Sequence, residues 1–351
     1  MNLKEKIKKT IILSALKKRI KQHPFNPEEA EKHQLSGDNN PFETNSYYFT
    51  GHNNDGNSFY CRYAIRGSGM VEIWFFFQTK DEIYYNEVDI FPIEKSPIQL
   101  ECLKIASTWK LTFQGELIKG TLENTQVQNS GRKVKCKADL NFQATSNIFD
   151  FEHDVNPEIL AKRLAKEKWD KNFRYNNKIS KQTHYEQQGL VQLVINIDDH
   201  ISTISFLAMR DHSFGRRDWN YMNNHIWLMA LVKNNVSLNI NMVNYPHMKL
   251  ITGYYEDNHQ VISITSSSDF FKFNGHGACL KQFAYYVKLA DGRKLEVSVN
   301  LESQIKWMFY NSYYICEGIG TYVIDGVSCR GIVEFGFNVN TARWESNNEN
   351  I

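Results

Sequence analysis

The segment at residues 209–219, MRDHSFGRRDW, carries the densest group of chemically active side chains in the sequence. It contains three arginines, two aspartates and one histidine. It directly follows residues 201–208, an apolar run typical of a β-strand. Buried charge is costly unless it is paired, so this pattern favours a polar cluster at the mouth of, or inside, a hydrophobic barrel.

Acid–base catalysis is the chemistry that this segment suits best. Asp211, held protonated in an apolar pocket, can donate a proton to an alkene or an enol, and His212 can carry a proton near neutral pH. Aromatic rings can stabilise a developing cation through their faces. We therefore predict Asp211 and His212 as catalytic residues. The predicted substrate-binding residues are Arg210, Arg217, Trp219, Tyr221, His225 and Trp227.

The same residues also have a structural interpretation. On a continued strand Arg210 and His212 face one side, and Asp211 faces the other. A buried Asp needs a cationic or hydrogen-bonding partner, and Arg–Asp pairs can simply fix an interface between two barrels. His225, at the start of an apolar strand, is also compatible with a hydrogen-bonded core histidine. The sequence leaves both interpretations open.

Signatures of a metal site or a cofactor are missing from the sequence. Residues 198–200 are Asp-Asp-His, but consecutive residues on a tight turn cannot all converge on one ion. The six cysteines lack the paired spacing of a zinc or redox site. We therefore predict catalysis without a metal and without a cofactor.

Composition and patterning predict an all-β protein. The 351 residues carry a net charge of +2, which gives no general attraction to nucleic acid, and 13% of them are aromatic. Short strand-like segments separated by turns run through both halves, as in sandwiches and barrels. Residues 71–78 are almost wholly apolar, as expected of a strand buried on both faces. A helix predicted from a cap at Asn156 to about Phe173 links the two β series.

The predicted organisation has five parts. They are an N-terminal basic amphipathic helix with its lead-in (1–36), a first β domain (37–155), a linker helix (156–178), a second β domain (179–340) and a disordered tail (341–351).

The N-terminal helix has an apolar face made of Leu3, Ile7, Ile11, Leu16 and Ile20, with lysines and arginines opposite. It can dock on the fold or on a partner, and it is also suited to lie on an anionic membrane. The sequence contains no apolar run as long as a membrane span, and the apolar stretch of this helix is too short for a signal peptide. We expect a cytoplasmic protein, with peripheral membrane contact as an open alternative and no indicated oligomeric state.

A set of short motifs resembles the hydroxyneurosporene synthase and AttH-type superfamily. The motifs are Tyr185-Glu186-Gln187, then residues 210–215 with Arg217, then Glu317-Gly318 and Glu334-Phe335-Gly336. The resemblance extends over about residues 42–337 and is closest to a domain that arthropod proteins fuse to phosphoenolpyruvate-synthase-like phosphotransferase modules. Phe214 departs from the Trp that much of the superfamily has. A Gly-rich phosphate loop is missing, so we expect no nucleotide chemistry.

This resemblance implies two tandem lipocalin-like β domains. It also implies that Glu186, as a catalytic residue, and Glu317, as a substrate-binding residue, complete the polar cluster; for Glu186 a purely structural hydrogen bond is the alternative. The superfamily is known for carotenoid hydratases and Diels–Alderase-type cyclases. The implied function is a cofactor-independent cyclase, isomerase or hydratase acting on a small hydrophobic, terpenoid-like substrate in a β-barrel pocket. A non-catalytic carrier of a lipid or isoprenoid, or an interaction module derived from a larger fused phosphotransferase, remains the alternative.

Overall fold

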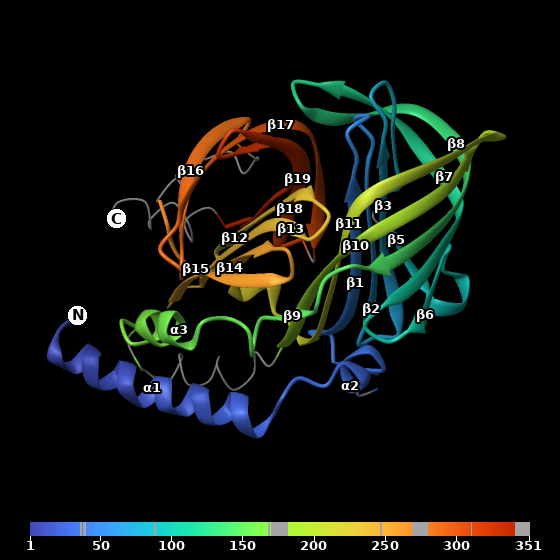
Figure 1. Cartoon of the computed structure of the whole chain (residues 1–351). Coiled ribbons are helices and arrows are strands. Elements are labelled where there is room, and N and C mark those ends of the chain that lie inside the picture. The colour runs from blue at the N-terminus through green and yellow to red at the C-terminus, as the bar shows by residue number, and fades with distance from the viewer. Residues whose placement is uncertain are drawn as a thin grey trace.

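The computed structural model describes residues 1–35, 37, 40–87, 89–167, 169, 182–245, 248–268, 280–309 and 311–340. Most of them belong to antiparallel strands, so the predicted all-β fold is confirmed. The tail predicted at 341–351 lies outside the described residues. Two closed rings of strands form the body of the protein, on the right and the left of Figure 1.

The first barrel takes strands from both halves of the sequence. Its ring runs β10–β8–β7–β4–β3–β2–β1–β11 and closes again on β10, while β5, β6 and β9 pair onto it. The strands are β1 (Glu43–His52), β2 (Ser58–Arg66), β3 (Met70–Gln78), β4 (Ile83–Tyr85), β5 (Asp89–Pro92), β6 (Ile98–Lys104), β7 (Thr108–Glu123), β8 (Gln126–Ala144), β9 (Phe149–Asp150), β10 (Gln182–Ile197) and β11 (His200–Arg216). A short 3-10 turn, η1 (Ile93–Lys95), precedes β6.

The position of β10 and β11 differs from the expectation. The sequence analysis assigned residues 182–216 to the second β domain, but β10 pairs with β8 and β11 pairs with β1. The two strands satisfy the backbone groups of β1 and β8, which would otherwise be unpaired edges. We therefore propose that the boundary between the two barrels follows β11.

The described residues of the second barrel form a ring of eight strands that follow one another in the sequence. Each strand pairs with the next, and the ring closes where β12 pairs with β19. The strands are β12 (Asn224–Lys233), β13 (Val236–Tyr245), β14 (Met248–Asp257), β15 (Gln260–Ser267), β16 (Gln282–Leu289), β17 (Lys294–Phe309), β18 (Tyr313–Ile324) and β19 (Val327–Asn338). The 3-10 turn η2 (Trp219–Tyr221) joins β11 to β12.

Side-chain alternation along the strands creates three apolar layers. On β12, Ile226 and Leu228 point into the second barrel, whereas Trp227 and Met229 point out of it, toward the first barrel. The interior of each barrel is filled by its own cluster of apolar side chains. A third cluster, which includes Trp74 of β3 and Trp227, joins outward-facing side chains of both barrels. The two barrels are therefore held together by a packed apolar interface.

In the described part of the chain, three helices lie outside the barrels: α1 (Leu3–Gln22), α2 (Pro27–Glu31) and α3 (Pro157–Leu164). The predicted cap of the linker helix is present, because the Asn156 side chain accepts a hydrogen bond from the Glu158 backbone N–H and Pro157 is the first helical residue. The helix ends at Leu164, so the predicted end near Phe173 is wrong. The indole N–H of Trp169 donates to the Leu164 carbonyl at 3.3 Å and satisfies one of the free acceptors at this helix end.

Helix α1 lies along α3 (Figure 1) and is tied to it by the Lys9–Glu158 ion pair at 2.5 Å. Its predicted apolar face is divided. Leu16 and Ile20 are half-buried, whereas Leu3, Ile7 and Ile11 remain 55–75% exposed. Among the described helices, none is long and apolar enough to cross a membrane.

Candidate functional site

A cavity of about 570 Å³ lies between the two barrels. Strands of both barrels contribute to its wall, including Tyr48 of β1, Trp74 of β3 and Trp227 of β12. The sequence analysis expected a pocket at the mouth of, or inside, one barrel. That location is wrong, because close-packed apolar side chains fill both barrel interiors.

Residues at one register level of five neighbouring strands of the first barrel form the cavity wall or, in the case of Glu186, support it from behind. Glu186 pairs with Asp211, Asp211 with Tyr48, Tyr48 with Arg62, and Arg62 with Trp74. Directly opposed residues of paired strands project from the same face of a sheet. This face is the outer face of the first barrel, and it is covered by the second barrel.

His184 and Asp211 form an imidazole–carboxylate pair in the cavity wall. His184 Nε2 is hydrogen-bonded to Asp211 Oδ2, and the His184 ring stacks on Phe151 with centroids 4.3 Å apart. Burial disfavours a charged imidazole, but the charge and hydrogen bond of Asp211, together with the charge of Glu186, raise the pKa of His184. The contact with Asp211 thus favours the protonated form of the His184 ring. His184 is not among the residues predicted from the sequence, although alternation along residues 184–186 places it on the same face as Glu186.

Glu186 lies behind this pair and is not part of the cavity wall. Its side chain is fully buried, and its Oε2 accepts hydrogen bonds from Asn239 and, at 3.0 Å, from Tyr254. Its Oε1 has no hydrogen-bond partner among the described residues and lies 3.7 Å from His184 Nε2. Burial raises the pKa of Glu186 to about 8. The charge of His184 lowers this pKa, and the charge of Asp211 raises it. Glu186 is thus a carboxyl group that can hold a proton near neutral pH.

One group among the described residues has metal-ligand geometry. A ring nitrogen of His184 and carboxylate oxygens of Glu186 and Asp211 lie within 4.8 Å of one another. The imidazole–carboxylate hydrogen bond by itself also explains why these atoms are close.

A second imidazole–carboxylate pair comes from the second barrel. His225 Nε2 lies 2.5 Å from Glu334 Oε1, and His225 Nδ1 lies 2.6 Å from the Tyr313 hydroxyl. Both His225 and Glu334 line the cavity. The alternative interpretation of His225 as a hydrogen-bonded histidine describes its contacts correctly, and its position also makes it part of the wall.

Glu317 supports this second pair from behind the wall. It faces Glu334 across β18 and β19, and it accepts a hydrogen bond of 2.5 Å from the Tyr48 hydroxyl. Burial, then the charge of Glu334, raises the pKa of Glu317 well above its usual value. For Glu334 the effect of burial is outweighed by the hydrogen bond and charge of His225 and by the hydrogen bond from Glu317, so its pKa is lowered. Glu317 therefore keeps its proton, and Glu334 is the carboxylate.

Arg217 is a cation in the wall without an ionic partner among the described residues. Its guanidinium lies over the Trp219 ring at 4.9 Å and donates only a long hydrogen bond, 3.4 Å, to Ser213 Oγ. It forms no ion pair with a carboxylate of the described residues. Burial lowers the pKa of Arg217, while Asp211, Tyr245 and Glu334 raise it. Arg217 thus lies within electrostatic reach of both imidazole–carboxylate pairs.

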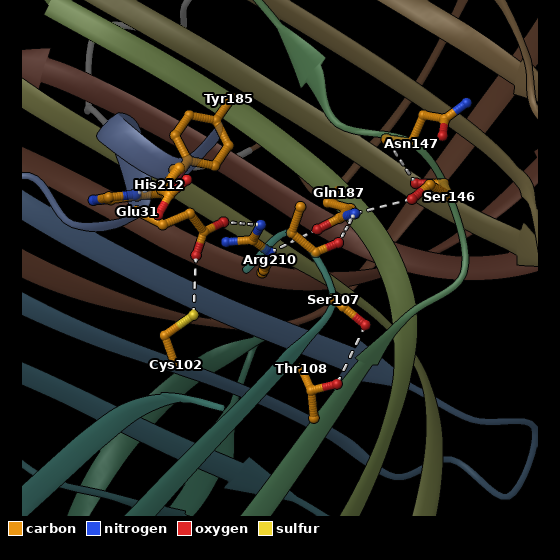
Figure 2. Close-up of polar contacts among 12 residues, drawn as sticks. Glu31, Cys102, Ser107, Thr108, Ser146, Asn147, Tyr185, Gln187, Arg210 and His212 are labelled. Atoms are coloured by element: carbon orange, nitrogen blue, oxygen red, sulfur yellow. Dashed lines mark hydrogen bonds and ion pairs between the residues drawn. The ribbon is translucent and has the colours of Figure 1, made fainter. Parts of the chain in front are cut away.

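Arg210 and His212 point away from the cavity, as their spacing around Asp211 predicts. Figure 2 shows Arg210 bonded to Glu31 of α2 and, at 2.9 Å, to Gln187. His212 lies between the Tyr185 hydroxyl at 2.5 Å and Asn45 Oδ1 at 2.6 Å. Burial first, then the charge of Arg210, lowers the pKa of His212 well below its usual value.

These two residues therefore belong to a buried polar network beside α2, away from the wall. Neither the catalytic role predicted for His212 nor the substrate contact predicted for Arg210 matches this location. Of the remaining predicted residues, the following line the cavity: Asp211, Arg217, Trp219, Tyr221, His225 and Trp227.

Comparison with known proteins shows the family and the fold. The family described as "Domain of unknown function (DUF7064)" matches residues 26–339, so the chain belongs to that family. A protein from Nitrosomonas europaea described as an AttH candidate superposes with a TM-score of 0.52 at 10% identity, over 84% of this chain and 92% of its own. Kievitone hydratase from Nectria haematococca superposes with a TM-score of 0.52 at 7% identity, and the match covers 88% of this chain and 94% of the hydratase. The curated proteins contain no match to the sequence. The AttH-like part of the predicted resemblance is therefore confirmed at the level of the fold.

Proposed function

We propose that this member of the DUF7064 family is an acid–base enzyme of the hydratase, isomerase or cyclase type. Its substrate is a small hydrophobic molecule bound between the two barrels. The observation that carries this proposal is a cavity of about 570 Å³ whose aromatic wall holds two imidazole–carboxylate pairs. Such a volume is typical of small-molecule sites. The fold that the chain shares with kievitone hydratase supports the hydratase class.

The His184–Asp211 pair is the proposed proton donor. The charge and hydrogen bond of Asp211 raise the pKa of His184 against the effect of burial, which favours the form of the ring that can donate a proton, and the same hydrogen bond fixes the orientation of the ring. The sequence analysis gave the donor role to Asp211 itself. We propose that the His184–Asp211 pair carries the transferred proton. Glu186, which lies outside the cavity wall, positions His184.

The His225–Glu334 pair is the proposed proton acceptor. Glu334 is a carboxylate in the wall, and His225 can share the accepted proton with it. Protonation of a substrate double bond by the first pair creates a carbocation. Removal of a proton from a neighbouring carbon, or from an attacking water molecule, by the second pair then completes an isomerisation, a cyclisation or a hydration. Trp219 and Trp227 in the wall can stabilise the cation meanwhile.

The narrower proposal is a terpenoid substrate, which the family resemblance supports. The alternative is a carrier that binds such a molecule without changing it. A carrier needs the cavity but does not need either imidazole–carboxylate pair.

The first test is native mass spectrometry of the purified protein, followed by extraction and identification of any bound molecule. That molecule, or a terpenoid panel if none is bound, is then incubated with the protein in D2O. We expect a product with deuterium at carbon from the wild type. We expect at least a hundredfold slower incorporation in Asp211→Asn and Glu334→Gln.

The matched control is Glu256→Gln, which removes a buried carboxyl group outside the cavity wall. It should keep the wild-type rate. A bound molecule that is recovered unchanged and without deuterium would establish a carrier and refute the enzyme.

A further inference from the structure

We infer that the substrate carries an acidic group, a carboxylate or an acidic hydroxyl, and that Arg217 binds this group. The inference deepens the proposed function, because it concerns the substrate class of the same cavity.

The first argument is the charge balance of the wall. Arg62 also lines the cavity, but Glu72 on the neighbouring strand pairs with it and, at 2.6 Å, with Arg66. Arg217 has no such carboxylate among the described residues. Arg217 is half-buried, and a partly desolvated cation without an ion-paired carboxylate is stabilised when an anion binds to it. Its planar guanidinium can also bind a carboxylate through two parallel hydrogen bonds.

The second argument is an excess of hydrogen-bond donors in the wall. The indole N–H groups of Trp74, Trp219 and Trp227 have no acceptor among the described residues. Buried donors in native proteins nearly always find an acceptor. A ligand that brings acceptor oxygens suits this wall better than a pure hydrocarbon does.

The third argument is the position of Arg217 relative to the proposed chemistry. Asp211 of the donor pair and Glu334 of the acceptor pair both act on its charge. An acid bound at Arg217 therefore anchors the substrate near both pairs, with its apolar part against the rings of Trp219 and Trp227. Arg217 is a substrate-binding residue in this scheme and takes no part in proton transfer.

The test uses two fluorescent probes that share one apolar skeleton. 1-Anilinonaphthalene-8-sulfonate carries an anionic group, and N-phenyl-1-naphthylamine is the same skeleton without it. Both probes are titrated into the full chain, and each dissociation constant is measured. We expect Arg217→Gln to raise the dissociation constant of the sulfonate at least tenfold. The dissociation constant of the neutral probe should stay within twofold of the wild-type value.

The matched control is Arg132→Gln, because Arg132 is an exposed arginine outside the cavity wall. It should change both dissociation constants less than twofold. Arg217→Lys, which keeps the charge and loses the planar fork, should give an intermediate loss for the sulfonate. Thermal melting of each variant checks that it is folded.

The outcomes separate this inference from the proposed function. If the neutral probe binds but the sulfonate is insensitive to Arg217→Gln, the inference is wrong and the cavity remains. The inference is also wrong if Arg132→Gln weakens binding of the sulfonate as much as Arg217→Gln does. If neither probe binds the wild type, the cavity is not a ligand site, and the proposed function fails with the inference.

Discussion

Glu186 shows how one buried carboxyl group couples the site to pH. Its pKa is raised to about 8 in the folded protein, chiefly by burial, from an ordinary value of 4.5. Between these two values the folded chain holds a proton that the unfolded chain releases. Stability from this group is therefore fully present below about pH 4.5 and decreases as the pH rises toward 8, by roughly 1.4 kcal/mol per pH unit.

We therefore predict that Glu186→Gln removes one component of alkaline destabilisation. Urea unfolding from pH 5 to 9 should show the wild type losing stability relative to this variant as the pH rises. Glu256→Gln is the control. Burial raises the pKa of Glu256 to about 7, so the loss of stability that this variant removes should end about one pH unit below the one caused by Glu186. Parallel stability curves for the wild type and Glu186→Gln would show that Glu186 is already ionised at pH 5.

The short helix α2 contributes to stability through one buried side chain. Glu31 is its last residue, its side chain has no exposed area, and it bonds to Arg210 of β11 (Figure 2). Cys102 of β6 donates a hydrogen bond to the same carboxylate at 3.6 Å. Removing one partner from a buried ion pair leaves an uncompensated charge, which commonly costs about 3–5 kcal/mol.

Glu31→Gln should therefore lower the free energy of unfolding by about 3 kcal/mol, measured by urea denaturation. Glu28→Gln is the matched control on the same helix, because Glu28 pairs with Lys32 in full contact with solvent. It should leave the urea midpoint unchanged. Equal midpoints for both variants would mean that α2 is not anchored through Arg210.

The strand elements also show what the sequence could and could not predict. Alternation correctly separated Asp211 from Arg210 and His212, because β11 stays regular through residue 216. The apolar run at residues 71–78 was correctly assigned to a strand buried on both faces. One face packs inside the first barrel and the other faces the second barrel, which is why no alternation is visible there.

The errors came from contacts between distant parts of the sequence. Pairing of β10 with β8 and of β11 with β1 decides which barrel these strands join, and no local pattern encodes it. For the same reason the cavity was placed in one barrel, since its two walls meet only when the barrels pack. His184 lies just outside the motif at residues 185–187, and its role depends on a contact with Asp211 of the neighbouring strand, which no local pattern encodes.

The cavity exists only while the two barrels remain packed together, so the interface that joins them should control the site as well as the stability. Trp74 of the first barrel and Trp307 of the second stack with ring centroids 5.3 Å apart and planes 10° apart. Trp74 also lines the cavity, so Trp307 holds part of the wall from behind. Trp307→Ala should cost about 3–5 kcal/mol of unfolding free energy, because it removes a large buried aromatic side chain.

The matched control is the adjacent residue, since Met308 is 45% exposed on the same strand. Met308→Ala should change stability by less than about 0.5 kcal/mol. Calorimetry and titration with N-phenyl-1-naphthylamine test both effects, and we expect Trp307→Ala to lower the melting temperature and to weaken the probe severalfold. A variant that loses stability but binds the probe as tightly as the wild type would show that the wall does not depend on this stack. Other contacts between the barrels would then hold the wall, because Trp227, His225 and Glu334 of the second barrel also line the cavity.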